Sequence, residues 1–116
     1  MFGPHSYQPP EDGMPPQEVR IQGLRAEPWS EDGRRYRIHI DITPFLERPN
    51  IEVAITNEDG DTVSSVSIIE SIDAHLAFTI HLRGEPDQLK GKLMLSASIL
   101  YPEIGEVDQE SVMIET

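Results

Sequence analysis

The stretch Arg35-Tyr36-Arg37-Ile38-His39-Ile40-Asp41-Ile42 decides the fold class of this chain. Polar and apolar side chains alternate at every step, which is the period of a β-strand with one buried face and one exposed face. The stretch therefore predicts a strand whose buried side chains are Tyr36, Ile38, Ile40 and Ile42.

The same alternation recurs on both sides of this strand. It is clearest over 76–82, where Phe78 lies in the middle of the apolar set and is expected in the core, and over 93–101. Val63 and Val66 are out of phase with each other, so a bulge is expected near Ser64 and Ser65. In the last strand, over 107–115, the inward residues are expected to be Val112 and Ile114. Further strands are expected near 19–21 and 51–55.

Turn signals separate these segments at intervals of eight to twelve residues. Asn57-Glu58-Asp59-Gly60-Asp61 supplies the residues that a tight hairpin favours, and Gly84-Glu85-Pro86-Asp87 interrupts the chain before 93–101. No window carries an apolar stripe of helical period that is long enough for more than a single turn. Seven short strands with this spacing predict an all-β fold, a seven-stranded antiparallel sandwich of two sheets.

This pattern resembles an immunoglobulin-like or fibronectin-type-III-like sandwich over Glu18–Thr116. The resemblance rests on the strand count and the alternation, and it holds at the level of the fold. Leu89-Lys90-Gly91-Lys92-Leu93-Met94-Leu95 lies where such domains carry their tyrosine corner, with Leu95 in the place of the tyrosine. The resemblance implies that the first, second and fifth strands are neighbours in one sheet, and that the third, sixth and seventh strands belong to the other.

Residues 1–17 differ in composition from the rest of the chain. They hold five of the ten prolines and almost no aliphatic side chains, so they cannot bury enough apolar surface to offset the entropy of ordering. We therefore expect a disordered, proline-rich N-terminal arm at 1–17 and a single sandwich domain at 18–116.

The charge of the chain limits its partners. With 21 acidic against 9 basic residues, the formal net charge is -12 at pH 7, which argues against nucleic acid or an anionic membrane as the main partner. The chain has no cysteine, no secretion signal and no long apolar run, so we expect it in the cytoplasm. It lacks the signatures of nucleophilic catalysis and phosphate binding, so we expect neither enzyme activity nor a cofactor.

The immunoglobulin-like strand order gives one sheet a basic outward face. Its arginines would form a patch that docks an acidic partner, and its histidines together with one aspartate would offer a first shell for a metal ion. The expected patch consists of Arg20, Arg35, Arg37 and Arg83, and the expected metal ligands are His39, His75, His81 and Asp41.

The outward face of the other sheet is expected to carry little charge. Methionine and small side chains on a flat sheet suit an adaptable partner surface or self-association. The expected interaction surface consists of Ala54, Met94, Ser96, Ser98, Leu100 and Met113.

These observations favour a non-enzymatic interaction or structural module. It would bind another protein, or a second copy, through a sheet face or an edge strand. The alternative is a metal or small-ligand binder that uses the outward histidines, and a weaker one is carbohydrate binding through Trp29.

Overall fold

The computed structural model describes residues 7–115, with Glu115 described by its backbone alone. Within this range the chain forms seven strands and two short 3-10 helices, and none of its helices is long and apolar enough to cross a membrane. The elements are η1 (Pro16–Glu18), β1 (Ile21–Pro28), β2 (Arg35–Ile42), β3 (Asn50–Thr56), β4 (Thr62–Ile68), β5 (His75–His81), η2 (Pro86–Leu89), β6 (Lys92–Tyr101) and β7 (Gly105–Glu115).

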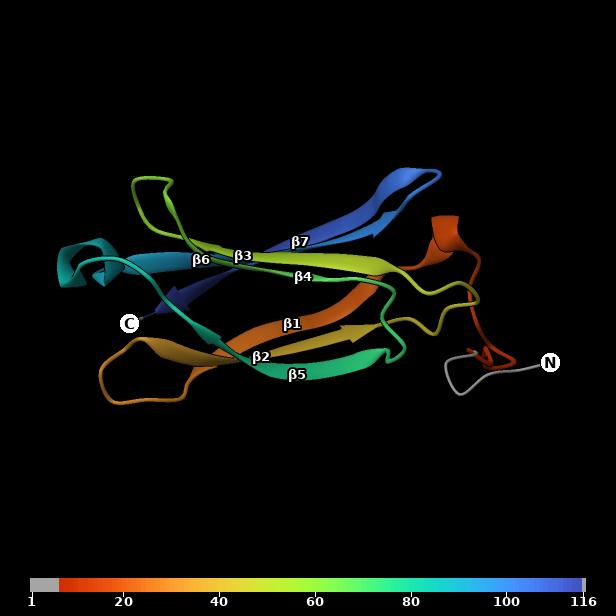
Figure 1. Ribbon diagram of the computed structural model, residues 1–116, viewed down its shortest axis with the longest axis horizontal. Helices are drawn as coiled ribbons and strands as arrows, with labels where there is room; N and C mark the ends of the chain where they lie inside the picture. Colours follow the sequence, from red (N-terminus) through yellow and green to blue (C-terminus); the bar gives the residue numbers. More distant parts are fainter. Residues whose placement is uncertain (1–6, 116) are drawn as a thin grey trace.

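The strands form two antiparallel sheets that pack face to face (Figure 1). The three-stranded sheet has the order β1-β2-β5, and the four-stranded sheet has the order β4-β3-β6-β7. The predicted all-β sandwich is confirmed, and so is the sheet assignment of the first, second and fifth strands. The resemblance to an immunoglobulin-like fold holds at the level of strand order.

The core lies between the two sheets. Each buried residue of β2, β3 and β6 belongs to the alternating set predicted from the sequence, and burial of one such side chain stabilises the fold by about 1.5–3 kcal/mol. Phe45, in the connection between β2 and β3, is also buried although no alternation marks it. Phe78 on β5 is only half-buried, because β5 is the edge of its sheet.

Three irregularities shift the register of the ladders, and one of them lies between Ile99 and Leu100 on β6, opposite β7. In the β3–β4 ladder, Ile55 pairs with Ser64 and Thr56 pairs with Thr62, so Val63 is the extra residue. The predicted bulge near Ser64 and Ser65 is therefore confirmed within one residue. A second irregularity, between Ile21 and Gly23 on β1, has no counterpart among the predictions.

Residues 7–17 contact one end of the sandwich. The ring of Tyr7 stacks on Phe45 with 5.5 Å between centroids, and its hydroxyl donates a hydrogen bond of 2.8 Å to the Phe45 carbonyl. Met14 forms an isolated bridge with Phe45, through its N–H to Pro44 and its carbonyl to Leu46. The predicted arm at 1–17 falls partly outside the described residues, and its mobility stays a prediction.

Candidate functional site

The four edge strands of the sandwich differ in how they are protected. Exposed edges offer unpaired backbone groups to other strands, and proteins usually block them with charges, prolines or bulges. β1 and β7 carry charges or proline, whereas β4 and β5 contain no Asp, Glu, Lys, Arg or Pro. β4 has the bulge at Val63 near one end, and β5 has neither a bulge nor a blocking residue. The blocking residues are Arg25, Glu27 and Pro28 on β1, and Glu106, Asp108 and Glu110 on β7.

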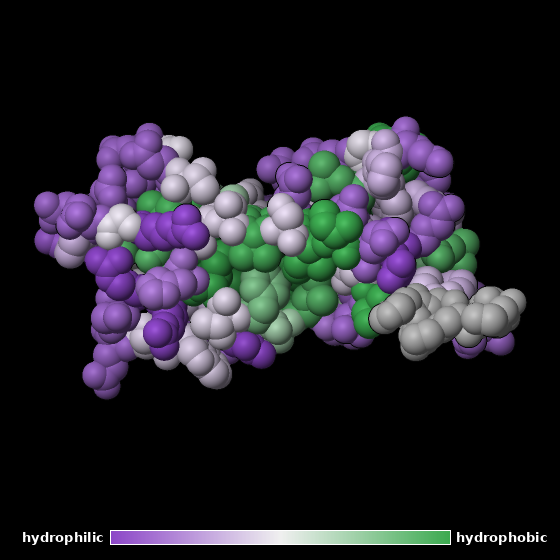
Figure 2. Space-filling model, in the orientation of Figure 1, coloured by the Kyte–Doolittle hydropathy of each residue, from purple (hydrophilic) through white to green (hydrophobic). Residues whose placement is uncertain are grey.

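The two unblocked edges lie on the same side of the molecule. Apolar side chains that point toward the core stay partly exposed between them, and we call this strip the seam, defined by Val66, Ile68, Leu76 and Phe78. Figure 2 shows hydrophobic residues gathered in a band along the middle of the face on which β4 and β5 lie. A further pair of exposed side chains, Ile69 and Ile72, lies in the connection between these strands. The seam therefore presents continuous apolar surface.

One end of the seam is closed by contacts between β4 and β5. The Arg83 N–H donates to the Val63 carbonyl at 2.8 Å, and the Ser64 hydroxyl donates to the His81 carbonyl at 3.0 Å. A groove of about 680 Å³ lies beside these contacts, lined by residues 62–66 and 79–83. The groove gives an extended chain a place to lie along the edge of β5.

The outer edge of β5 has free backbone groups. The Leu82 N–H donates to the Arg34 carbonyl on the β2 side at 2.7 Å, whereas the His81 carbonyl accepts its bond on the opposite side. Backbone groups alternate in direction along a strand, so those of His75, Ala77 and Thr79 point away from β2 as those of His81 do. β5 can therefore hydrogen-bond one more strand.

The predicted basic patch is brought together in part. Arg35 and Arg37 lie on the outward face of β2, and Arg83 follows β5 at the same end of the sheet. Arg20 lies at the opposite end, where its backbone pairs with Thr43 and its guanidinium donates to the Gln17 and Val19 carbonyls. Arg20 precedes β1 and is not part of the patch.

Arg37 is held in place by neutral groups. Its guanidinium carbon lies 5.6 Å from the centroid of the Trp29 ring, which is the geometry of a cation–π contact. Its Nη1 also donates a hydrogen bond of 3.1 Å to the Thr79 hydroxyl on β5. Trp29 stays 58% exposed. Within residues 7–115 its ring stacks on no other aromatic ring, and carbohydrate binding through it stays a prediction.

The predicted metal ligands are mostly separated. His75 Nδ1 lies 2.7 Å from Asp41 Oδ1, which brings two of the four together. His39 lies opposite Ala77 in the ladder, and His81 lies opposite Arg35. Among the described residues, no group of three or more His, Cys, Asp or Glu side chains gathers as a metal site would require. Metal binding stays a prediction that this arrangement does not favour.

His39 instead contacts Glu27, a residue that the sequence analysis missed. The hydrogen bond from His39 lowers the pKa of the Glu27 carboxyl, and the positive charges of His39, Arg25 and Arg37 add to this effect. The bulge at the start of β1 places Arg25 and Glu27 on the outward face. The only sequence signal was the alternation of Leu24 and Ala26 after Gly23, which is too short to predict a strand.

The outward face of the four-stranded sheet is assembled as predicted. Ala54 pairs with Ser96 between β3 and β6, and Met94 pairs with Met113 between β6 and β7. Most of this surface is half-buried by its own neighbours, and Met113 is its most exposed apolar side chain at 49%. The remaining predicted members, Ser98 and Leu100, lie farther along β6. Binding through this face stays a prediction.

No family model matches this sequence, and no curated protein matches it. Solved structures are similar in fold. A glycosyl hydrolase family 2 member from Bacteroides cellulosilyticus has a TM-score of 0.63 at 11% identity, covering 84% of this chain and 14% of that chain. A β-glucuronidase from glycoside hydrolase family 2 has a TM-score of 0.55 at 12% identity, covering 84% of this chain and 12% of that chain. A β-glucuronidase from Ruminococcus gnavus in complex with D-glucuronic acid has a TM-score of 0.51 at 12% identity, covering 84% of this chain and 16% of that chain.

The chain thus spans only 12 to 16% of the length of these enzymes. Their identities to it are so low that the likeness concerns the fold alone. The comparisons therefore support an immunoglobulin-like sandwich and leave its role to be inferred from its own surface.

Proposed function

We propose that this chain is a non-enzymatic protein-interaction module that binds an extended segment of a partner along β5. The observation that carries the proposal is the absence of blocking residues on β4 and β5, beside half-buried apolar side chains and free backbone groups. An added strand would gain main-chain hydrogen bonds from the edge and side-chain contacts from the seam, as in other cases of strand addition.

The other edges support this choice by contrast. β1 ends in Pro28, and Asp108 and Glu110 on β7 have the phase of the inward residues Val112 and Ile114. Asp108 also accepts a hydrogen bond of 2.8 Å from the backbone N–H of Ile21 on β1. Charges in such positions oppose the addition of a strand. Binding is thereby directed to the seam.

The test uses a backbone change that leaves the internal ladder intact. Ala77→Pro removes an N–H that points away from β2, so it blocks strand addition without removing a bond to β2. Ala77→Val keeps the N–H and serves as the matched control. A seven-residue peptide that alternates glutamine with valine is titrated to millimolar concentration while amide resonances are followed by NMR.

We expect the peptide to shift the resonances of His75, Ala77 and Thr79 in the wild-type protein and in Ala77→Val. In Ala77→Pro these shifts should vanish, while circular dichroism shows that the sandwich is retained. Equal binding by the proline variant, or shifts confined to β6 and β7, would overturn the proposal.

A further inference from the structure

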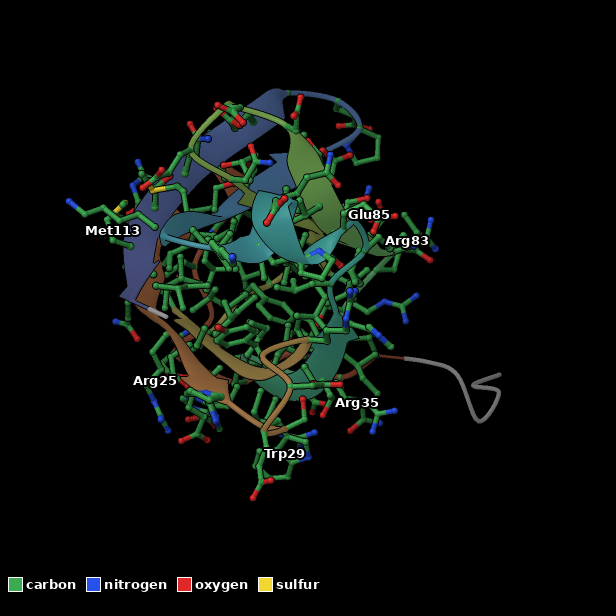
Figure 3. All side chains as sticks on the ribbon, turned by 90° about the vertical axis from the view of Figure 1, so that its left-hand side faces the viewer. Arg25, Trp29, Arg35, Arg83, Glu85 and Met113 are labelled. Atoms are coloured by element: carbon green, nitrogen blue, oxygen red, sulfur yellow. The ribbon has the colours of Figure 1, made fainter. Side chains whose placement is uncertain are left out.

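The seam leads at its closed end into a cluster of arginines. Arg34 and Arg35 precede and begin β2, Arg37 follows on its outward face, and Arg83 follows β5. Figure 3 looks at this end of the sandwich and shows Arg35 and Arg83 on the same flank, where β5 lies. A chain lying along the open edge of β5, up to Thr79, would end beside this cluster.

These four arginines form no ion pair with the described side chains, although the protein has 21 acidic residues. Arg34 donates to the Gly84 carbonyl at 3.0 Å, and Arg37 contacts Trp29 and Thr79. By contrast, Arg25, Arg48 and Lys90 each pair with a carboxylate. The four guanidinium groups at the end of the seam therefore remain available to carboxylates from outside.

Acidic residues close to the cluster have hydrogen-bond partners of their own. Glu27, which lies opposite Arg37, bonds to His39, although the charge of Arg37 also contributes to its lowered pKa. Glu85, two residues after Arg83, caps η2 in a reciprocal arrangement with Gln88. Asp32 accepts hydrogen bonds from the Ser30 hydroxyl and from the backbone N–H of Arg34. These hydrogen bonds lower the pKa of Asp32 most, and the positive charges of Arg34 and Arg35 make the two smallest contributions.

The sheet geometry sets the pattern of the incoming strand. Residues of β5 alternate between the seam side, with Leu76 and Phe78, and the outward side, with Thr79 beside Arg37 and His81 beside Arg35. A strand added to β5 continues the same alternation. Its inward residues must therefore be apolar, and its outward residues meet the arginines.

We propose that the segment bound at the seam is an acidic amphipathic strand of another protein, with apolar residues at alternate positions and carboxylates between them. This inference rests on the proposed function and adds the chemistry of the partner. The carboxylates would lie near Arg83 and, across the width of β5, face the long side chains of Arg35 and Arg37, where arginine offers paired donors to a carboxylate. A second copy is disfavoured as the occupant because it would bring its whole net charge of -12 against the same charge, whereas an acidic strand brings only the carboxylates that face the arginines.

Three labelled seven-residue peptides test the proposal by fluorescence anisotropy. Valine alternates with glutamate in the first, with glutamine in the second and with lysine in the third. We expect the glutamate peptide to bind at least tenfold more tightly than the glutamine peptide, and the lysine peptide to bind most weakly. The advantage of the glutamate peptide should shrink as salt rises from about 50 to 500 mM, because salt screens exposed charges.

The variant Arg35→Gln with Arg83→Gln should reduce binding of the glutamate peptide to about that of the glutamine peptide and leave the latter unchanged. The control, Arg25→Gln with Arg48→Gln, makes the same change in charge at arginines that already have partners. It should have little effect on either peptide.

The outcomes separate this inference from the proposed function. Equal binding of the glutamate and glutamine peptides, both lost in Ala77→Pro, would overturn the acidic partner and keep strand addition at β5. Binding that persists in Ala77→Pro, or no binding by any peptide, would overturn both. A dimer of the wild-type chain that Ala77→Pro converts to a monomer would identify a second copy as the occupant and overturn the acidic partner.

Discussion

His39 Nε2 on β2 lies 2.9 Å from Glu27 Oε1 on β1, in the middle of the outward face of the three-stranded sheet. The two residues are diagonal neighbours, since Glu27 is directly opposite Arg37 and His39 is directly opposite Arg25. The contact ties the edge strand β1 to the centre of its sheet.

The Glu27 contact should make stability depend on pH. The pKa of the Glu27 carboxyl is lowered in the folded state, so the ionised carboxylate stabilises the fold above the ordinary pKa of 4.5. This stabilisation is lost as the pH falls through the lower pKa of the folded state. Wild type should therefore melt at a higher temperature than Glu27→Gln near pH 6, and the difference should vanish near pH 3. Glu52→Gln, on the other sheet, is the control. A difference that persists at pH 3 would show that the ionised carboxylate is not its source.

Tyr101 should titrate far above an ordinary tyrosine. Burial, together with the negative charges of Glu47 and of ionised Tyr7, raises the pKa of Tyr101 to about 12. Its hydroxyl donates a hydrogen bond of 2.8 Å to the Glu47 carbonyl. Because the folded pKa is raised, stability should be complete below pH 10 and fall as the pH rises toward 12.

Absorbance at 295 nm measures the ionisation of tyrosine directly. Tyr101→Phe should remove the latest step of this titration and lower the free energy of unfolding at pH 7 by about 1 kcal/mol, the net value of one hydrogen bond. A titration curve whose latest step survives in Tyr101→Phe would assign that step to another tyrosine.

The two phenylalanines of the described structure should differ in their contribution to stability. Phe45 is 1% exposed, so Phe45→Ala should lower the free energy of unfolding by about 3–5 kcal/mol. Phe78 borders the seam, so Phe78→Ala should lower the free energy of unfolding by about half as much. Thr79→Ala, on the opposite face of β5, should lower it least. Urea unfolding of the three variants measures this order. If Phe78→Ala proves the costlier of the two phenylalanine variants, the seam is closed in solution.

Residues 7–14 should contribute to stability through Phe45. Removal of residues 1–17 deletes the Tyr7 stack and the Met14 bridge, and we expect the melting temperature to fall by several degrees, since about 1 kcal/mol shifts a domain of this size by about 4–8 °C. Tyr7→Ala in the full chain should reproduce part of the loss, and Gln8→Ala should have no effect. An unchanged melting temperature after truncation would support a dispensable arm.

The outward face of the four-stranded sheet offers an independent comparison. Met94→Lys and Leu100→Glu lie away from the edge of β5, so they should leave peptide binding at the seam unchanged. Sedimentation velocity of the same variants tests self-association through this face. If either substitution abolishes peptide binding while the sandwich stays folded, the binding site belongs to this face and not to the seam.

Much of the fold follows from local sequence. Side chains alternate between the two faces of a strand, so the inward residues of β2, β3 and β6 could be identified without any knowledge of their neighbours. The turn at Asn57 is equally local, because its side-chain oxygen accepts the backbone N–H groups of Asp59 and Asp61. Even the bulge at Val63 was visible as a break in the alternation.

The candidate site depends on contacts between distant parts of the chain. Alternation marks Phe78 as inward, but it does not show that Phe78 stays half-buried. The burial of Phe78 depends on which edge strands of the two sheets lie side by side, here β4 and β5. In the same way, Arg20 and Arg35 look equivalent in sequence, and only the position of the start of β1 places them at opposite ends of a sheet. The sequence alone determined the strands and their buried faces through local periodicity, whereas the tertiary structure decided which edges and charges remain exposed together.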